Sequence, residues 1–350
     1  MKTAFLYNDI FRGSDYGKKH PVTINRVTNV YDLSKILDFD KNVDYINNDL
    51  ATIDELSKFH DADYLHVLKS TEEKQFITKE LAKKYNLGTA DNPIFKEMFR
   101  RHAAAAGALL LATKLIKSKY NRIFSPGSGA HHAKQKKASG FCYLNDIAIC
   151  ILELQRVGFS KILYLDMDAH YGDGVIEYFR DDSKVLTIST HQENLWPKHN
   201  IFEFDKKGKV VNIPLKKGFN DEDFIELFNE DFFYPYIVDY RPEVILLQMG
   251  ADCLQFDKYS DLNLSNNSMV YVIKKMKELE SKIVVMGGGG YNPWITLRAW
   301  IYNLAILAEF ELPKSLSQEA KKFLRNIEWK EEPKEQWLNT IIDKPNIFER

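Results

Sequence analysis

Six nearly continuous apolar runs, each of strand length, recur along this chain and alternate with segments of helical spacing. The runs are TAFLY (3–7), RIFS (122–125), KILYLDMD (161–168), KVLTIST (184–190), VILLQMG (244–250) and KIVVMGG (282–288). Unbroken apolar runs are typical of strands buried on both faces of a parallel sheet, because strands with one wet face alternate instead. The predicted helices are 94–118, 145–157, 222–239, 265–280 and 293–309. This alternation predicts a single α/β domain over residues 1–350, with a mainly parallel central sheet and helices on both faces.

Composition narrows the functional classes. Of the 350 residues, 45% are hydrophobic and 28% charged, which is enough apolar material for a substantial core. The net charge of −1 gives no basic field that would favour nucleic acid or an anionic membrane. The N-terminal stretch does not resemble a secretory leader, and the three cysteines form no CxxC motif, so we expect a cytoplasmic protein. Residues 10–90 predict loops and short helices, and the tail from about 313 predicts a packed C-terminal extension.

Polar or glycine-rich sequence follows five of the six predicted strands. The stretches that follow them are SPGSGAHHA, AHYGDG, HQENLWP, ADCLQFD and GGYNPW. Open α/β sheets bind their ligands at the carboxyl ends of the strands. One polar strand end is weak evidence for a site, but five together predict that the site lies at this edge of the sheet.

The strand over 161–168 ends in charge. Asp166, Asp168 and His170 alternate, so their side chains lie on one face of an extended chain. Ionisable groups at the end of a buried strand are costly unless something pairs with them, and a metal ion does so economically. Asp252, at the end of another predicted strand, supplies a third ligand. Two carboxylates and one imidazole leave coordination positions open, which is typical of a catalytic metal site.

Two further clusters supply acid, base and hydrogen-bond donor groups. His131 and His132 lie in a glycine-rich loop, and imidazole titrates near neutrality. Tyr291 follows four glycines, where a phenol donates to an oxyanion formed at an attacked carbonyl. Metal, base and oxyanion donor together predict hydrolysis of an amide or ester. Each group also has a structural interpretation: Asp173 could begin the helix in GDGVIEYF, and lone histidines are usually structural or surface residues. We interpret four of them in this way: His20, His60, His66 and His102.

With these groups in this order, the chain resembles the histone deacetylase superfamily, which has the arginase/deacetylase fold. This superfamily includes the bacterial acetoin-utilisation-type and acetylpolyamine-type amidohydrolases. The motifs that carry the resemblance are HPVTINR, ADNP, PGSGAHHA, GFCYLND, LDMDAHYGDGV, STHQENLWP, QMGADCLQFD and GGGGYN. They stand in family order over residues 20–292, and jointly they are highly specific. The resemblance implies a class I-like, zinc-dependent deacetylase.

The resemblance also implies roles for individual residues. The metal ligands would be Asp168, His170 and Asp252, binding Zn²⁺, although two oxygen donors and one nitrogen also suit Fe²⁺. His132 would be the general base and His131 its electrostatic or acid partner, with Asp166 and Asp173 orienting them. Tyr291 would polarise the acyl carbonyl. Asp166 and Ser189 would help to hold a structural K⁺.

A further set of residues is implied to bind substrate. Phe141 and Trp196 would form the aromatic walls of an acyl-lysine tunnel that Gly140 also lines. Asp91 would bind substrate backbone at the rim, and Arg26 would lie near an internal acetate exit. Tyr259 stands where polyamine-specific relatives carry a gatekeeping glutamate, which argues against a polyamine preference.

Three functions remain open. The leading one is deacetylation of acetyl-lysine in proteins or peptides. The second is hydrolysis of small acylated amines such as acetylpolyamines; an arginase-like reaction ranks lower because it needs ligands for a second metal. The third is a non-catalytic acyl-lysine-binding protein, which would usually have lost a ligand, the base or the tyrosine.

Overall fold

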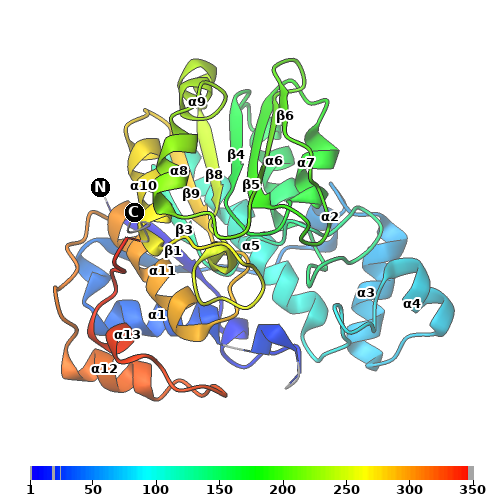
Figure 1. Cartoon of the computed structure of the whole chain (residues 1–350). Coiled ribbons are helices and arrows are strands. Elements are labelled where there is room, and N and C mark those ends of the chain that lie inside the picture. Colours follow the sequence, from blue (N-terminus) through cyan, green and yellow to red (C-terminus); the bar gives the residue numbers. More distant parts are fainter. Residues whose placement is uncertain (1, 18–19, 24, 346–350) are drawn as a thin grey trace.

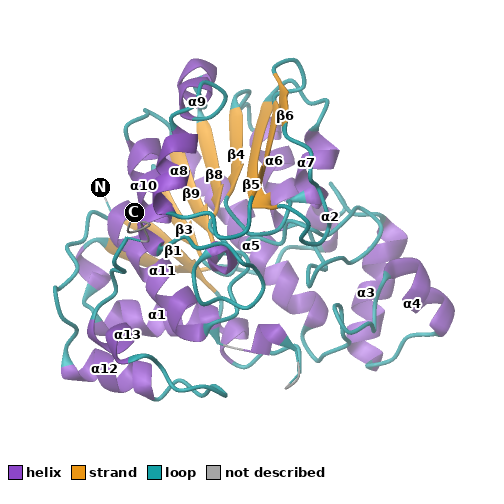
Figure 2. Cartoon of the chain, in the orientation of Figure 1, coloured by secondary structure: helices purple, strands orange, loops and turns teal. Residues whose placement is uncertain are grey.

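Each of the six apolar runs forms a strand of one sheet in the computed structural model, which describes residues 2–17, 20–23 and 25–345 (Figures 1 and 2). These strands are β1 (Thr3–Tyr7), β3 (Arg122–Ser125), β4 (Ile162–Asp166), β5 (Val185–Gln192), β8 (Val244–Gln248) and β9 (Lys282–Met286). Three more strands complete the sheet in the described chain: β2 (Val43–Asn47), β6 (Glu203–Asp205) and β7 (Val210–Leu215). The strand order is β2-β1-β3-β9-β8-β4-β5-β7-β6, and among the strands of the described residues only β6 and β7 pair antiparallel. The predicted mainly parallel α/β sheet is therefore confirmed.

Helices cover both faces of this sheet. The longer ones are α1 (Arg26–Ile36), α3 (Ala62–Lys74), α5 (Met98–Ser118), α6 (Asp146–Arg156), α10 (Asn266–Lys277) and α11 (Pro293–Leu307). The shorter ones are α2 (Ile53–Leu56), α4 (Lys79–Tyr85), α7 (Asp173–Phe179), α8 (Asp221–Phe228), α9 (Tyr234–Tyr240), α12 (Gln318–Arg325) and α13 (Glu335–Asn339). Residues 10–90 do contain loops and short helices, but they also carry α1, α3 and the strand β2.

The alternation of side chains along each strand builds two cores. Leu163 and Leu165 of β4 lie in one buried cluster, together with side chains from α1 and from α8 through α13. Ile162 and Tyr164 of the same strand lie in a second cluster, together with α3, α6, α7 and most of α5. Because successive strand residues point to opposite faces, a fully apolar strand packs against both helical layers. In the part of the chain that the structure describes, helices therefore cover both faces of the sheet at its centre.

One predicted helix is wrong. Residues 222–239 form two helices, α8 and α9, separated by residues 229–233. Pro235 stands in the first turn of α9, where its missing N–H costs nothing, but a proline inside one continuous helix would break the hydrogen-bond ladder. Helical spacing of the apolar residues continues across the break, which explains why the pattern suggests one helix.

The C-terminal extension packs against the body of the protein as expected. Leu316, Ala320, Leu324, Trp337 and Ile341 are buried in the same cluster as α11. Cys142, Cys150 and Cys253 are free and buried. None of the described helices combines the length and the apolar character that crossing a bilayer demands.

Candidate active site

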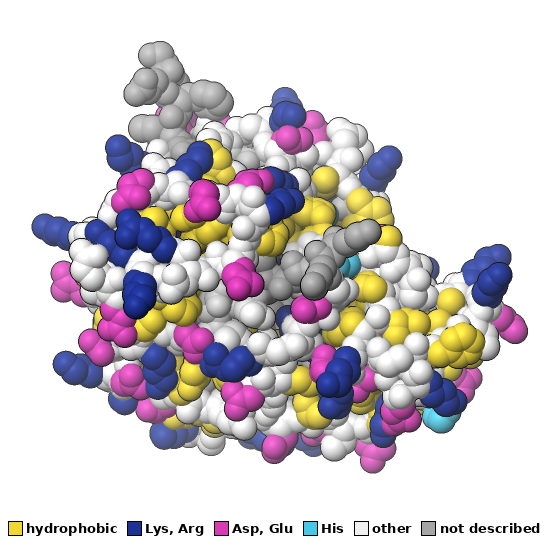
Figure 3. All heavy atoms as spheres, turned by 90° about the horizontal axis from the view of Figure 1, so that it is seen from below, with side chains coloured by type: hydrophobic (Ala, Val, Ile, Leu, Met, Phe, Trp, Pro, Cys, Tyr) yellow, Lys and Arg dark blue, Asp and Glu magenta, His cyan; other side chains and the backbone are white. Residues whose placement is uncertain are grey.

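The five strands whose ends are polar in the sequence are neighbours in the sheet. They are β3, β9, β8, β4 and β5, in that spatial order, and all of them run parallel. Their carboxyl ends therefore meet at one edge, as expected for a ligand site in an open α/β sheet. The face onto which they open shows interspersed acidic and basic side chains (Figure 3). Every group predicted to take part in the chemistry reaches this edge from one of the five loops.

Three ligand-type side chains converge at the centre of the edge. Asp168 and His170 follow β4, and Asp252 lies in the short 3₁₀ turn Ala251–Cys253 after β8. One donor atom from each residue lies within 4.8 Å of the other two, the single such group among the residues that the structure describes. His170 Nδ1 lies 3.1 Å from Asp168 Oδ1 and 3.0 Å from Asp252 Oδ2. The donor set predicted from two separate stretches of sequence is thus assembled by the adjacent strands β4 and β8.

The electrostatics of these carboxylates suit a cation. Burial raises the pKa of Asp168, but the charges of His131 and His170 and a hydrogen bond from the Gly289 N–H outweigh it and bring the pKa below its ordinary value. Burial and the adjacent charge of Asp168 raise the pKa of Asp252. Two buried carboxylates this close together repel unless a positive charge lies between them. Oxygen and nitrogen donors of this kind fit a divalent ion such as Zn²⁺ or Fe²⁺.

The carboxylates around His131 favour its imidazolium form. Its Nδ1 lies 2.8 Å from Asp166 Oδ2, and its Nε2 lies 3.8 Å from Asp168 Oδ1. Burial alone would lower the pKa of this histidine, but the charges of Asp166 and Asp168 raise it to about 9. The hydroxyl of Tyr164 donates to Asp166 Oδ2 at 2.6 Å. This hydrogen bond fixes the carboxylate that in turn orients His131.

His132 has a different environment, although its ring centroid lies only 3.9 Å from that of His131. Its Nδ1 lies 2.7 Å from Asp173 Oδ1, while Lys134 Nζ lies 2.7 Å from the other oxygen of that carboxylate. Burial and the charge of His131 lower the pKa of His132 to about 4, against the opposite effect of Asp173. The neutral form of His132 is therefore favoured at physiological pH. Asp173 binds Nδ1 of this ring and not Nε2. Asp173 also begins α7, so the structural interpretation of this residue holds as well.

Tyr291 follows the glycine loop after β9. Arg26 Nη1 donates to the carbonyls of Gly288 and Gly290, each at 2.9 Å, and the Gly289 N–H donates to Asp168 Oδ2 at 2.7 Å. A Cβ at residue 289 would overlap the Asp252 carboxylate, so glycine is required there for close approach. Burial, together with the charges of Asp252 and Asp168, raises the pKa of Tyr291 well above its ordinary value. The phenol therefore keeps its proton and can act as a donor.

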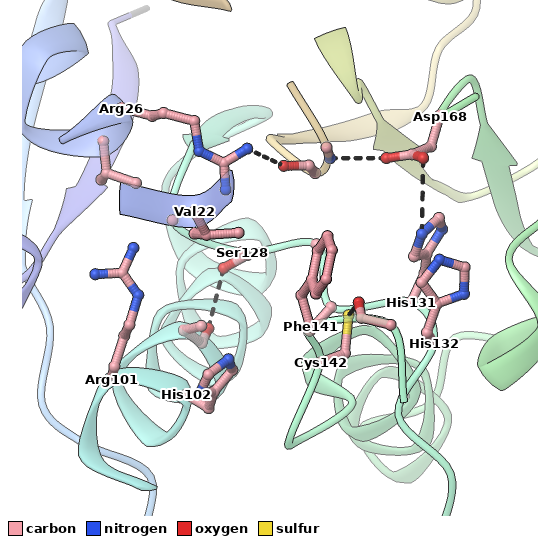
Figure 4. A pocket seen from close by; sticks show the side chains of 18 of the residues that line it. Val22, Arg26, Arg101, His102, Ser128, His131, His132, Phe141, Cys142 and Asp168 are labelled. Atoms are coloured by element: carbon pink, nitrogen blue, oxygen red, sulfur yellow. Dashed lines mark hydrogen bonds and ion pairs between the residues drawn. The ribbon is translucent and has the colours of Figure 1, made fainter. Parts of the chain in front are cut away.

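A cavity of about 90 Å³ lies beside these groups, lined in part by His131, His132, Phe141, Asp168 and Tyr291 (Figure 4). Phe141 has a left-handed φ of 66°, held by a hydrogen bond from its N–H to the Asn92 side chain and from the Tyr16 hydroxyl to its carbonyl.

The predicted tunnel walls flank His132. The ring centroid of Trp196 lies 4.7 Å from that of His132, and its side chain remains 46% exposed. A Cβ on Gly140 would overlap both rings. Trp196 and Gly140 thus lie against His132, while Gly140 and Phe141 line the cavity, and their role as tunnel walls stays a prediction.

The remaining predicted residues occupy the rim and the interior. Asp91 and Tyr259 line an open groove of about 540 Å³ next to Phe141. The ring of Tyr259 lies 4.2 Å from that of Tyr291, measured between centroids. Arg26 lines the cavity beside the predicted metal ligands. Ser189 is buried on β5 opposite Asp166, and its hydroxyl bonds His191 Nδ1 at 3.0 Å. Their proposed roles toward substrate or K⁺ stay predictions.

Several supporting residues were missed in the sequence. Lys134 and Tyr164 bind the two histidine-orienting carboxylates, and Asp146 accepts hydrogen bonds from the N–H groups of Gly129 and Ala130 at 2.9 and 2.8 Å. Tyr164 could have been found, because it lies two residues before Asp166 on the same face of the strand. For Lys134 and Asp146 the sequence holds no comparable signal. Lone His20, His60 and His102 are buried, and His66 is exposed, in line with their structural interpretation.

Comparison with known proteins agrees with this geometry. Residues 20–307 match the histone deacetylase domain model. The chain is 31% identical over 319 residues to histone deacetylase 6 of Arabidopsis thaliana, covering 89% of this chain and 67% of the relative. A solved structure of a histone deacetylase homologue from Aquifex aeolicus superimposes with a TM-score of 0.90 at 33% identity, covering 98% of this chain and 95% of that one. A homologue solved in complex with SAHA gives a TM-score of 0.91 at 33% identity, covering 99% and 96%.

Proposed function

The chain belongs to the histone deacetylase family, whose members are hydrolytic deacetylases, and from this premise we propose that it removes acetyl groups from lysine side chains of proteins or peptides with a bound divalent metal ion. The observation that carries the proposal is the convergence of a metal-type donor set, two differently tuned histidines and a tyrosine on one cavity. The homologue bound to the inhibitor SAHA supports an acyl-lysine-like substrate, because its fold matches this chain over nearly its full length.

Asp168, His170 and Asp252 would hold the ion. Zn²⁺ is favoured by the family, and Fe²⁺ also suits two oxygen donors and one nitrogen. A divalent ion in such a site polarises a carbonyl and lowers the pKa of water, which makes hydroxide attack feasible at neutral pH. Asp166 would orient His131, and Asp166 and Ser189, together with backbone carbonyls, would help to hold a K⁺ ion.

The two histidines divide the proton transfers. His132 is neutral, and Asp173 fixes its Nδ1, so Nε2 takes the proton from the attacking water. His131 carries a proton at neutral pH because Asp166 and Asp168 stabilise its charge. It therefore stabilises the negative charge that develops during attack and supplies a proton to the leaving amine. Opposite environments around two identical side chains are a recognised way to separate acid and base.

Tyr291 completes the site. Its phenol stays protonated and donates a hydrogen bond to the oxygen of the attacked carbonyl. Phe141, Gly140 and Trp196 would enclose the aliphatic part of an acyl-lysine and exclude water around it. Asp91 would bind substrate backbone at the rim, and Arg26 would attract the acetate product in the interior.

Hydrolysis of small acylated amines is the second candidate. Its support is the exposed carboxylate of Asp91 in the rim groove, which could attract a free amine. Against it, Tyr259 presents an aromatic ring where a second carboxylate would be needed. A silent binding protein is disfavoured because the ligand set, His132 and Tyr291 are all present.

The test compares metal content and turnover in two variants. Asp168→Ala should lose both the metal, by elemental analysis, and hydrolysis of an acetyl-lysine peptide, because a ligand is removed. His132→Ala is the matched control: it should keep the metal and lose about 10²–10⁴-fold in kcat, because the base is removed and the ligands are not. Active wild-type protein without stoichiometric metal, or full activity in His132→Ala, would contradict the proposal.

A further inference from the structure

A carboxylate that touches neither the ligand set nor the cavity ties the loops of the site together. Asp257 is 8% exposed and lies five residues after Asp252 in a compact turn. The turn is closed by the Ser260 hydroxyl, which donates to the Asp252 carbonyl at 2.5 Å. Asp257 therefore occupies a fixed position relative to the proposed ligand Asp252.

The two oxygens of Asp257 accept hydrogen bonds from two different loops. Oδ1 accepts from the N–H of Tyr259 at 3.0 Å, within its own turn. Oδ2 accepts from the N–H groups of Tyr291 and Asn292 at 2.6 and 3.1 Å, across to the loop after β9. Asn292 in turn caps α11 by accepting from the N–H of Trp294. One side chain thus anchors the backbone of Tyr291 at the point where the glycine loop becomes a helix.

This anchor counters the flexibility of the preceding residues. Four glycines, 287–290, lead into Tyr291, and Gly288 and Gly290 have φ values of 123° and 130°. Glycine backbones have more freedom than any other residue, so the direction of the next side chain is poorly fixed by the chain itself. The ring of Tyr291 contacts Tyr259 and Phe141, at centroid distances of 4.2 and 5.9 Å. Because Asp257 holds the backbones of both tyrosines, it fixes this ring pair as a unit.

We propose that Asp257 is the positioning residue for Tyr291: it aims the phenol toward the acyl carbonyl and holds Tyr259 against it. The inference rests on the proposed function for its catalytic consequence, but the anchoring itself is a property of the fold. A charged acceptor serves this purpose better than a neutral one, because hydrogen bonds from N–H groups to a carboxylate are shorter and stronger.

The kinetic test uses Asp257→Asn, which keeps the size of the side chain but replaces one oxygen with an amide that cannot accept. In the metal-loaded full chain, kcat on an acetyl-lysine peptide should fall about 10- to 100-fold, the effect of one lost hydrogen bond to a charged group. KM should change less than about threefold, because Tyr291 acts mainly in the transition state. In a Tyr291→Phe background the same substitution should cost less than about threefold, since the two residues act through one group.

A second measurement does not depend on activity. Amide hydrogen exchange in the segment 287–292 should accelerate about 10- to 100-fold in Asp257→Asn, because one neutral amide oxygen cannot accept from the N–H groups on both sides and accepts more weakly than a carboxylate. Asp221→Asn is the matched control. Asp221 is also a buried carboxylate, and it accepts from the Ser265 N–H and the Ser268 hydroxyl at 2.8 and 2.6 Å, away from the site. This variant should leave both kcat and exchange in segment 287–292 unchanged.

The outcomes separate the two proposals. If wild-type protein hydrolyses no acyl-lysine peptide while exchange still accelerates in Asp257→Asn, the proposed function fails and the anchoring role stands. If exchange in segment 287–292 is unchanged, Asp257 does not hold Tyr291. Equal kinetic losses in the wild-type and Tyr291→Phe backgrounds would also overturn the inference, because they would show that Asp257 acts independently of the phenol.

Discussion

His131 and His132 show how neighbouring side chains of one kind acquire opposite character. Both rings are buried and both bind an aspartate through Nδ1. Asp166 and Asp168 both act on His131 and raise its pKa, whereas the charge of His131 itself helps to lower the pKa of His132. Lys134 forms an ion pair with the second oxygen of Asp173, which weakens the effect of that carboxylate on the pKa of His132. These partners support the proposed roles of His132 as base and His131 as its electrostatic or acid partner.

Tyr291→Phe tests the phenol directly. The substitution removes one oxygen and keeps the ring between Tyr259 and Phe141, so the fold and the peptide affinity should change little. If the hydroxyl stabilises the oxyanion, kcat should fall about 10²–10³-fold, corresponding to about 2.7–4 kcal/mol. Steady-state kinetics on an acetyl-lysine peptide measure this loss. Wild-type kcat in the variant would mean that the hydroxyl contributes nothing to the chemical step.

Residue identities were predictable where chemistry concentrates in a short stretch. The alternation of Asp166, Asp168 and His170 predicted one face of a strand, but β4 ends at Asp166, and a bend over residues 168–170 brings Asp168 and His170 together instead. Asp252 required a further step, the adjacency of two strands, which the shared parallel pattern supports. Asp257 could not be identified from the sequence, because its importance depends on which N–H groups the fold brings to it. From the sequence alone, a single aspartate after a turn is interpreted as a helix cap, because the loop whose N–H groups it binds is not known.

At the scale of elements, the loop that carries the tandem histidines is fastened at several points. Asp146, the first residue of α6, accepts from the Gly129 and Ala130 N–H groups. At the other end of the loop, the Asn145 N–H donates to His60 Nε2 at 2.8 Å, and His60 Nδ1 lies 3.2 Å from the Gln135 carbonyl. Both contacts are satisfied when His60 is neutral with its proton on Nδ1. Protonation of Nε2 would break the bond from Asn145.

This arrangement makes stability depend on pH through His60. Burial lowers the pKa of His60 from 6.5 to about 4. Because the folded pKa lies below the unfolded one, the stabilisation is fully present above about pH 6.5 and is lost as the pH falls toward 4. The loss is on the order of 3 kcal/mol, from 1.36 kcal/mol per pKa unit. His60→Gln keeps an acceptor oxygen but does not titrate, so it should be less stable than wild type at pH 7 and lose less on acidification.

Urea unfolding of both proteins between pH 7 and 4 measures this difference, and the other ionisable groups cancel in the comparison. Parallel stability curves for wild type and His60→Gln would show that His60 takes up its proton as readily in the folded protein as in the unfolded one.

Elements were predictable where they are buried on both sides. The central strands are continuous apolar runs and were identified within two residues or so of their observed ends. Strand β7 was missed: Pro214 interrupts its pattern, and proline normally argues against a strand because it donates no ladder hydrogen bond. It is tolerated there beside the short strand β6, which pairs with Val210–Asn212 and leaves Pro214 outside that ladder. Strand β2, at the edge of the sheet, is only half-buried, so its apolar sequence pattern is weaker than that of the central strands.

At the scale of the whole molecule, the C-terminal extension braces the side of the sheet that carries Tyr291. Arg298 of α11 donates through Nε to the Thr340 carbonyl at 2.8 Å and pairs with Asp343 at 2.7 Å. Asn266, at the start of α10, donates to the Ile341 carbonyl at 2.9 Å. Composition predicted that this tail packs. Where it packs is set by its contacts with α10 and α11, which no pattern within the tail itself indicates (Figure 1).

Trp337 is the apolar centre of this contact, and we expect it to contribute strongly to stability. Its side chain is 4% exposed and stacks on Trp294 of α11 at 6.2 Å between ring centroids, with Phe256 at 5.7 Å. Trp337→Ala should therefore lower the free energy of unfolding by about 3–5 kcal/mol, because it removes a large buried ring and leaves a cavity beneath the extension.

Trp329→Ala is the control within the same extension. Its ring is only partly buried, and the loss should be about half as large, since the cost scales with the apolar area buried. Urea unfolding midpoints measure both variants. Equal midpoints for Trp337→Ala and wild type would mean that the extension lies against α11 without stabilising it.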